Sequence, residues 1–200
     1  MASLNSRRPA PDSAILKAWE HASLRERLIL RLAGELGLRR TEIALVHSRD
    51  LVEDLDGWSL LVHGKGNRNR ILPLSASLSV AIREATLSGG GYAFPGNDNG
   101  HLSPRWVGTL ISRILPRDVT LHQLRHRFAT LTHQETGDVR LVQALLGHSS
   151  LATTQRYIDM HSDQLRAGLE RATSRLTISP ALKHRHHHAA WRSHATPQQR

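Results

Sequence analysis

Cysteine is absent from this chain of 200 residues, and so are long apolar runs. The lack of cysteine excludes disulfides, thiolate metal sites and a thiol nucleophile. No segment approaches the ~18 consecutive apolar residues that a membrane-spanning helix needs, and residues 1–12 have no apolar signal core. We therefore expect a cytoplasmic protein without a membrane partner.

Aromatic residues are also scarce, at 4% of the chain. Proteins that bind single-stranded RNA usually stack its bases on aromatic side chains, so this scarcity disfavours a small RNA-binding module. Hydrophobic residues make up 39% of the sequence, which is typical of a folded globular domain. A chain of this length can bury one full core.

Positive charge is what the sequence has in excess, with a net charge of +10 when histidine is neutral. Four of these charges lie in residues 177–200, which have no acidic residue, so 10 − 4 = 6 remain on the rest of the chain. The excess points to a polyanionic partner, and nucleic acid is the leading candidate. A DNA-binding protein would also be associated with the nucleoid.

The first part of the chain predicts helices. Asp12 or Ser13 can cap a first short helix, and Ser23 and Glu26 have the spacing of a capping box. The second helix should end at Gly37, where a short third helix follows. Leucines at intervals of four predict the buried face of the second helix: Leu24, Leu28, Leu32 and Leu36.

Residues 49–74 change to the pattern of strands. Asp56-Gly57 marks one turn and the segment 64–67, Gly-Lys-Gly-Asn, marks a second, which predicts a three-stranded antiparallel meander. Lys65 would lie at the tip of the second turn. Helices should resume at residues 75–87 and, after a loop at 97–100, at Ser103. The predicted fold class is α+β, mainly α, with a small three-stranded antiparallel sheet.

A further helix is expected to start at the capping box of Thr120 and Gln123. His122, Arg125 and His126 are spaced by three and four residues, so they share one side of its first turns. The free backbone N–H groups and the helix dipole at this end favour a bound phosphate. Asp138 can cap the next helix.

The segment 145–159 holds the most reactive candidate, Tyr157. Gly147 should close one helix, His148 follows it, and a serine can cap a short helix over residues 151–158. A lone tyrosine on a helix is usually a half-buried anchor, and this segment alone leaves that alternative open.

Polar residues at predicted helix starts and turn tips form one set: Arg39, Lys65, His122, Arg125, His148 and Tyr157. In order and local context the set resembles the catalytic domain of the tyrosine recombinase (phage integrase) family. The resemblance spans residues 12–176. It rests on four short sequence motifs, or boxes: Gly37-Leu-Arg39-x-x-Glu42, Gly64-Lys65-Gly-Asn with Arg70 and Pro73, His122-x-x-Arg125-His126, and Leu146-Gly-His148 through Thr154-x-x-Tyr157.

This resemblance implies a site-specific DNA recombinase that cleaves and rejoins strands through a covalent 3′-phosphotyrosine, without a metal, ATP or another cofactor. The residue types fit that chemistry, because two arginine forks can stabilise the charge that builds on phosphate oxygens and tyrosine can take a phosphoryl group. Arg39 and Arg125 would hold the phosphate, and His148 would donate a further hydrogen bond. Tyr157 would be the nucleophile.

The resemblance also implies the remaining roles. Lys65 would be the general acid, His122 would assist proton handling and Glu42 would orient its neighbours. The expected partner is double-stranded DNA, bound by a homotetramer on two DNA sites with accessory DNA-bending proteins. The family usually has a core-binding domain before the catalytic domain, so this chain is expected to be a fragment or a short, fimbrial-invertase-like member.

The expected domain organisation is a flexible arm at residues 1–11, a catalytic domain at 12–176 and a basic, His-rich tail at 177–200. Residues 162–176 predict an amphipathic helix that docks on a neighbouring subunit or packs within its own chain. Two alternatives remain open for function: a non-catalytic or partner-dependent DNA-binding regulator that retains the fold, and a nicking-closing enzyme that resembles type IB topoisomerases.

Overall fold

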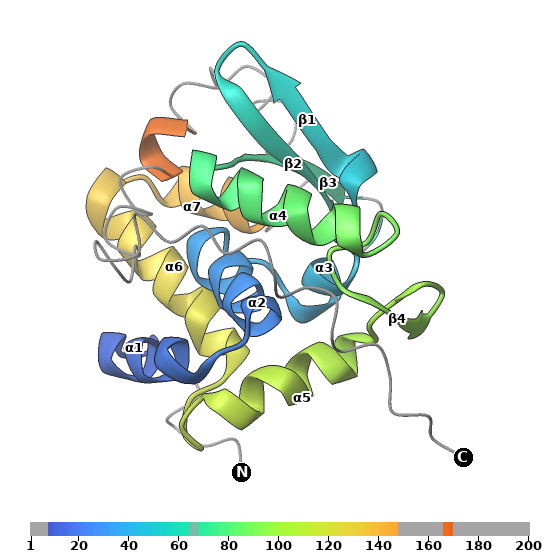
Figure 1. Cartoon of the computed structure of the whole chain (residues 1–200). Coiled ribbons are helices and arrows are strands. Elements are labelled where there is room, and N and C mark those ends of the chain that lie inside the picture. Colours follow the sequence, from blue (N-terminus) through green and yellow to red (C-terminus); the bar gives the residue numbers. More distant parts are fainter. Residues whose placement is uncertain (1–7, 65, 67, 148–165, 170–200) are drawn as a thin grey trace.

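The computed structural model describes residues 8–64, 66, 68–147 and 166–169 (Figure 1). Within these residues it contains helices α1 to α7, a three-stranded sheet and a short strand, β4. Several predicted features lie outside the described residues: Lys65, His148, Tyr157, the helix of residues 151–158, most of the arm and the tail of residues 177–200.

The chain begins with helices α1 (Asp12–His21), α2 (Leu24–Glu35) and α3 (Arg40–Ala44). The capping box predicted at the start of α2 is confirmed. The Glu26 backbone N–H donates to Ser23 Oγ at 3.3 Å, and the Ser23 N–H donates to the Glu26 carboxylate at 2.9 Å. These two bonds satisfy N–H groups that the first helical turn leaves without a partner.

Two predictions about these helices are wrong. Neither Asp12 nor Ser13 caps α1, because the helix already begins at Asp12 and Pro11 occupies the N-cap position. The Asp12 carboxylate instead accepts a hydrogen bond from Arg127 Nε at 2.8 Å. Leu24 is 46% exposed, because it lies in the first turn of α2 beyond the region that other elements cover. The other leucines of the predicted face are buried: Leu28, Leu32 and Leu36.

The predicted antiparallel meander is confirmed. Its strands are β1 (Leu51–Asp54), β2 (Gly57–Gly64) and β3 (Arg68–Pro73), in the order β1-β2-β3. The first turn consists of residues 55–56, one residue earlier than expected, because Gly57 already pairs with β1.

Helices resume with α4 (Ala76–Ser88) and, after β4 (Pro95–Asp98), with α5 (Pro104–Ile114). The prediction of a loop at residues 97–100 is wrong for residues 97 and 98, because β4 extends to Asp98, which forms a bridge with His101. Both helices have a serine N-cap whose side chain accepts a backbone N–H: Ser75 and Ser103.

The last two long elements are α6 (Leu121–Thr136) and α7 (Val139–Leu146). Thr120 and Gln123 form the predicted capping box at the start of α6, and Asp138 caps α7 by accepting two backbone N–H groups. Each helix is followed by a glycine with positive φ, a conformation that glycine adopts without a steric penalty: Gly137 and Gly147.

Figure 1 shows how these elements surround one core. Helices α2 and α6 pack against each other in the centre, α5 forms the base, and α4 packs on β2 of the sheet at the top. Leu169, in the short helical segment 166–169, is buried in the same core. The large side chains at the centre include Phe94, Phe128, Ile29, Leu32 and Ile82. The predicted fold class, mainly α with a small antiparallel sheet, is confirmed. None of the described helices is long and apolar enough to cross a membrane.

Candidate active site

Glu42 forms the centre of a cluster of three arginines, which come from three of the four boxes of the sequence. It lies in α3, only 5% exposed, because its side chain turns back over the start of its own helix. Arg39, at the N-cap, donates its backbone N–H to Glu42 Oε2 at 2.8 Å and its Nη1–H to Oε1 at 2.9 Å. The Arg39 side chain remains 42% exposed, so it can also contact a ligand.

Arg70 reaches the same carboxylate from β3. Its Nη1 donates to Glu42 Oε1 and its Nη2 to Oε2, both at 2.9 Å, and its Nε donates to the Leu145 carbonyl of α7 at 2.8 Å. With Arg39, this gives each Glu42 oxygen two donors, which fills the lone-pair sites of a carboxylate. Glu42 therefore fixes the orientation of two arginines at once.

Arg125 enters the cluster from the first turns of α6 and is 5% exposed. Its Nη1 donates to the Gly37 carbonyl and its Nη2 to the Leu146 carbonyl at 2.7 Å. Nη1 lies 3.8 Å from Glu42 Oε2, close enough for charge attraction but beyond hydrogen-bond length. Backbone groups from two elements thus hold the Arg125 guanidinium beside Glu42.

Gly37 allows this arrangement because it has no side chain. It has φ +63°, and a Cβ there would lie 2.5 Å from Phe128 Cδ1 and 2.9 Å from Leu146 Cδ2. The turn between α2 and α3 can therefore pass directly over α6, where its carbonyl meets Arg125.

The cluster carries an excess of positive charge, since three guanidinium groups surround one carboxylate. Burial raises the pKa of Glu42, but the hydrogen bonds and charges of Arg70 and Arg39 lower it more, so the pKa lies below its ordinary value of 4.5. Burial and the charge of Arg39 lower the pKa of Arg125 to about 9. Glu42 and Arg125 are therefore both charged at pH 7. Three guanidinium groups around one carboxylate leave a formal net charge of +2, which favours an anion.

The structure brings together three of the residues that the sequence singled out: Arg39, Glu42 and Arg125. His122 is exposed in the first turn of α6, one turn before Arg125. His126 is half-buried, and its Nδ1 lies 3.5 Å from the Thr130 hydroxyl. Lys65, His148 and Tyr157 lie outside the described residues, so their predicted roles remain predictions.

Arg70 is the member of the cluster that the sequence analysis did not assign to the site. The signal that could have found it is the alternation of β3, in which Ile71 is 55% exposed and Leu72 is 1% exposed. Arg70 shares the parity of Leu72 and pairs with the buried Val62 of β2. An arginine on the inner face of a strand needs a buried partner, and Glu42 is that partner.

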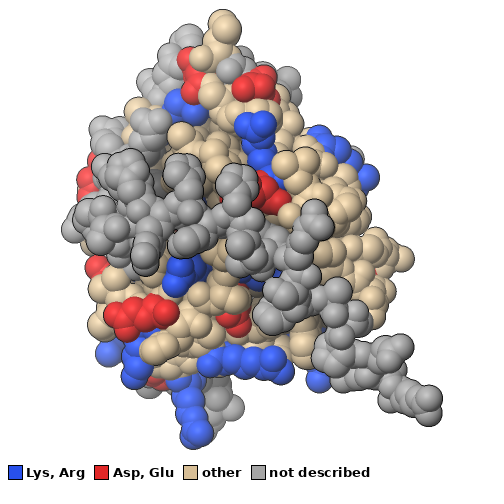
Figure 2. Space-filling model, viewed as in Figure 1, with Lys and Arg blue, Asp and Glu red and all other residues tan. Residues whose placement is uncertain are grey.

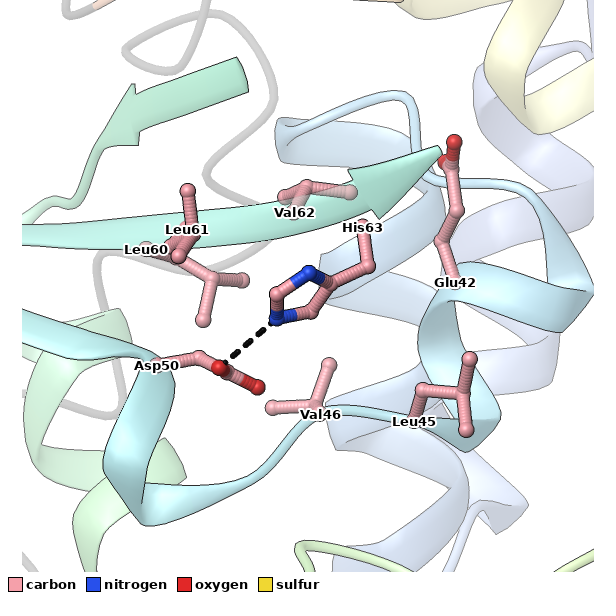
Figure 3. Close-up of a pocket in the computed structure, with 8 residues that line it drawn as sticks. All are labelled: Glu42, Leu45, Val46, Asp50, Leu60, Leu61, Val62 and His63. Atoms are coloured by element: carbon pink, nitrogen blue, oxygen red, sulfur yellow. Dashed lines mark hydrogen bonds and ion pairs between the residues drawn. The ribbon is translucent and has the colours of Figure 1, made fainter. Parts of the chain in front are cut away.

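A small pocket lies beside the cluster, between α3, the 3₁₀ turn η2 (Ser48–Asp50) and β2 (Figure 3). His63 Nε2 and Asp50 Oδ1 are 2.8 Å apart across it. Its cavity volume of about 10 Å³ corresponds to roughly one water molecule. A larger ligand would therefore bind over the surface near Arg39 rather than in this pocket.

Basic side chains also lie on the outer surface. Figure 2 shows Lys and Arg over the lower part of the face viewed, in the region of α1 and α5. Arg105, Arg113 and Arg117 are exposed on and after α5, and Arg113 lies over the exposed Trp106 ring at 5.3 Å. This surface can contact an extended polyanion through several charges at once.

Comparison with known proteins identifies the group to which this fold belongs. The model of the phage integrase family matches residues 12–164, which is more than half of the chain and includes the whole arginine cluster. The chain belongs to the phage integrase family.

Two relatives, one known by sequence and one by structure, match this chain over about half of their own length. The tyrosine recombinase XerC of Xanthomonas axonopodis pv. citri (strain 306) is 38% identical over 151 residues, which cover 71% of this chain and 49% of that protein. The solved integrase from mycobacterium phage Brujita has a TM-score of 0.70 and 32% identity, and the match covers 82% of this chain and 57% of that one.

The lambda integrase catalytic core shows the same phage integrase fold. The match covers 70% of this chain and 91% of that structure, with a TM-score of 0.55 and 22% identity. At that identity the likeness shows the fold alone. This chain therefore shares its fold with that catalytic core.

Proposed function

We propose that this chain is the strand-cleaving part of a site-specific DNA recombinase. The observation that carries the proposal is the convergence of Arg39 and Arg125 on Glu42 in a member of the phage integrase family. The XerC relatives, which are named tyrosine recombinases, and the Brujita integrase support the same activity. The chain spans about half of their length, so the activity of the whole protein is part of the proposal.

The arginine cluster suits a phosphodiester under attack. When a fifth oxygen approaches phosphorus in line, negative charge builds on the two non-bridging oxygens. A planar guanidinium matches such oxygens with parallel N–H donors. Arg39 is partly exposed and Arg125 is held by backbone carbonyls, so both can present N–H groups in a fixed orientation without reorganising during the reaction.

In the proposed reaction Tyr157 Oη attacks the phosphorus, and the bond between phosphorus and the 5′ oxygen breaks. The tyrosine proton passes to a neighbouring base, for which His122 is our candidate, and Lys65 gives a proton to the leaving 5′ oxygen. His148 donates a hydrogen bond to the phosphate. The resulting 3′-phosphotyrosine keeps the bond energy, so a 5′ hydroxyl can reverse the step without ATP, a metal or another cofactor.

The partner in this proposal is double-stranded DNA, which fits the net charge of +10. Exchange between two duplexes requires four strand cuts. Because the proposal gives each chain one nucleophile, a homotetramer on two DNA sites would supply four, with accessory DNA-bending proteins as further partners. Action on the bacterial nucleoid in the cytoplasm follows from that partner.

A covalent-adduct assay tests the proposal. The full chain is incubated with a nicked suicide duplex that carries its own flanking DNA, and a protein–DNA adduct is sought on a denaturing gel. We expect an adduct with the wild type and none with Tyr157→Phe. Tyr92→Phe is the matched control, because Tyr92 is the other tyrosine of the sequence and its ring contacts His47 and His101, which are not members of the cluster.

Two outcomes would contradict the proposal. An adduct that persists in Tyr157→Phe would remove Tyr157 from the reaction, and the absence of an adduct with the wild type on every flanking site would favour a DNA-binding regulator. A parallel incubation in excess chelator tests the metal-free step, which we expect to proceed at an unchanged rate.

A further inference from the structure

Arg70 links three elements that carry different parts of the proposed site. It extends from β3, its fork holds Glu42 of α3, and its Nε holds the Leu145 carbonyl at the end of α7. The side chain is 9% exposed, so these bonds are made away from bulk water. Charged hydrogen bonds in such surroundings restrict the relative movement of the groups they join.

The end of α7 is held by two arginines of the cluster. Arg70 binds the carbonyl of Leu145, and Arg125 binds the carbonyl of Leu146, the next residue. Gly147 then takes a positive φ of +63°, and a Cβ there would lie 2.9 Å from Arg70 Nη1. The chain therefore leaves α7 tightly against the Arg70 guanidinium, one residue before His148.

We propose that Arg70 is a positioning residue that fixes the end of α7 and the Glu42 carboxylate relative to Arg39 and Arg125. Arg70 acts through Glu42 and the Leu145 carbonyl and does not itself contact the phosphate. This inference rests on the proposed strand cleavage, because it assigns Arg70 a role in that step. A displacement of about 1 Å between reacting groups is enough to slow a reaction by about 10²-fold.

Arg31 provides a control with the same chemistry outside the cluster. Its Nε and Nη2 donate to the carboxylate of Glu35 at 2.6 and 3.0 Å, and its Nη1 donates to the Ser77 carbonyl at 3.1 Å. It too is largely covered, with a side chain that is 16% exposed. Arg31 therefore joins α2 to α4 in the way that Arg70 joins three elements of the site.

The test compares Arg70→Lys with Arg31→Lys, because lysine keeps the charge and loses the fork. The first measurement is hydrogen exchange of the α7 amides. In Arg70→Lys we expect exchange at the end of α7 to be about tenfold faster, since one charged hydrogen bond to that turn is lost. In Arg31→Lys we expect faster exchange in α2 and α4, and an exchange rate in α7 that is the same as in the wild type.

The second measurement is the single-turnover rate of adduct formation with saturating protein, together with duplex affinity. We expect Arg70→Lys to slow adduct formation by about 10²-fold with duplex affinity within about twofold, because affinity is spread over many phosphates. Arg31→Lys should leave both quantities close to wild type. A role in general stability would instead slow both variants in proportion to their loss of unfolding free energy.

The outcomes separate this inference from the proposed function. An Arg70→Lys variant with wild-type exchange in α7, or with wild-type adduct formation, would overturn the positioning role. If the wild type itself forms no adduct, strand cleavage and the role of Arg70 in it are both wrong. Faster exchange in Arg70→Lys would then establish only a structural link.

Discussion

Glu35 and Glu42 are both buried carboxylates that accept a fork of hydrogen bonds from an arginine, yet their surroundings differ in charge. Among the described residues Glu35 is paired with Arg31 alone, which gives a neutral pair between α2 and α4. Glu42 binds Arg39 and Arg70 and lies 3.8 Å from Arg125, which leaves a net charge of +2. Both groups join elements of the fold, but only the Glu42 cluster has an excess of positive charge that can attract a ligand of the opposite sign.

The largest expected effect is on strand cleavage in Arg125→Ala. Removing a preorganised donor from a developing oxyanion typically slows the chemical step by about 10²–10³-fold. Most duplex affinity should remain, because it comes from many phosphate contacts. Single-turnover adduct formation and duplex binding are measured on the same preparations, with Arg31→Ala as the control. Equal loss of cleavage and affinity in Arg125→Ala would remove Arg125 from the chemistry.

The largest expected effect on stability, as distinct from activity, is that of Glu42→Gln. Breaking a buried ion pair by removing one partner costs about 3–5 kcal/mol, because charge is left without compensation. Here it leaves Arg39, Arg70 and Arg125 to repel one another. Glu35→Gln should cost about 1–3 kcal/mol, since Arg31 can turn towards water. Urea unfolding at pH 7 measures both, and a larger loss in Glu35→Gln would contradict the comparison.

The contribution of Glu42 should also depend on pH. Its pKa is lowered in the folded protein, so the folded state favours the ionised carboxylate. The stability that this provides is present above the ordinary pKa of 4.5 and is lost as the pH falls through the folded pKa. The difference in unfolding free energy between the wild type and Glu42→Gln should therefore shrink with acidification below about pH 5. If the difference in unfolding free energy instead grows below about pH 5, the predicted direction of the pH dependence is wrong.

The smallest expected effect is stabilisation by inorganic phosphate. An anion that binds the folded cluster at about ten times its dissociation constant raises the unfolding free energy by about 1.4 kcal/mol. For a chain of this size that corresponds to an increase in Tm of about 3 °C. Arg39→Ala should remove the increase because Arg39 is the exposed member of the cluster, and Arg31→Ala should retain it. Equal shifts in all variants would indicate a general salt effect.

The elements that could be predicted from the sequence are those with local causes. The capping boxes at Ser23 and Thr120, the cap at Asp138 and the three-strand meander follow from residues within a few positions of one another, and each is confirmed. Arg39, Glu42 and Arg125 could be named as a site because their local contexts resemble the boxes of one family.

The wrong prediction at Asp12 and the omission of Arg70 both result from contacts between residues that are far apart in the sequence. The carboxylate of Asp12 has a better partner in Arg127, which is far away in the sequence, than in the backbone of its own helix. Arg70 belongs to the cluster because the register of β2 and β3 turns it inward and the packing of α7 places the Leu145 carbonyl within its reach. The alternation along β3 indicates the inward direction locally, but the packing of α7 cannot be derived from the residues around Arg70 alone.

Besides the Glu42 carboxylate, the main-chain carbonyls of Gly37, Leu145 and Leu146 accept hydrogen bonds from Arg70 and Arg125. Every residue type supplies such an oxygen, so the anchoring alone does not determine the side chains at positions 145 and 146, which are buried in the core for their own packing. Position 37 differs, since a Cβ there would collide with Phe128. An alanine scan at positions 145 and 146 will report the loss of two buried leucine side chains, whereas the carbonyl anchors themselves stay in place.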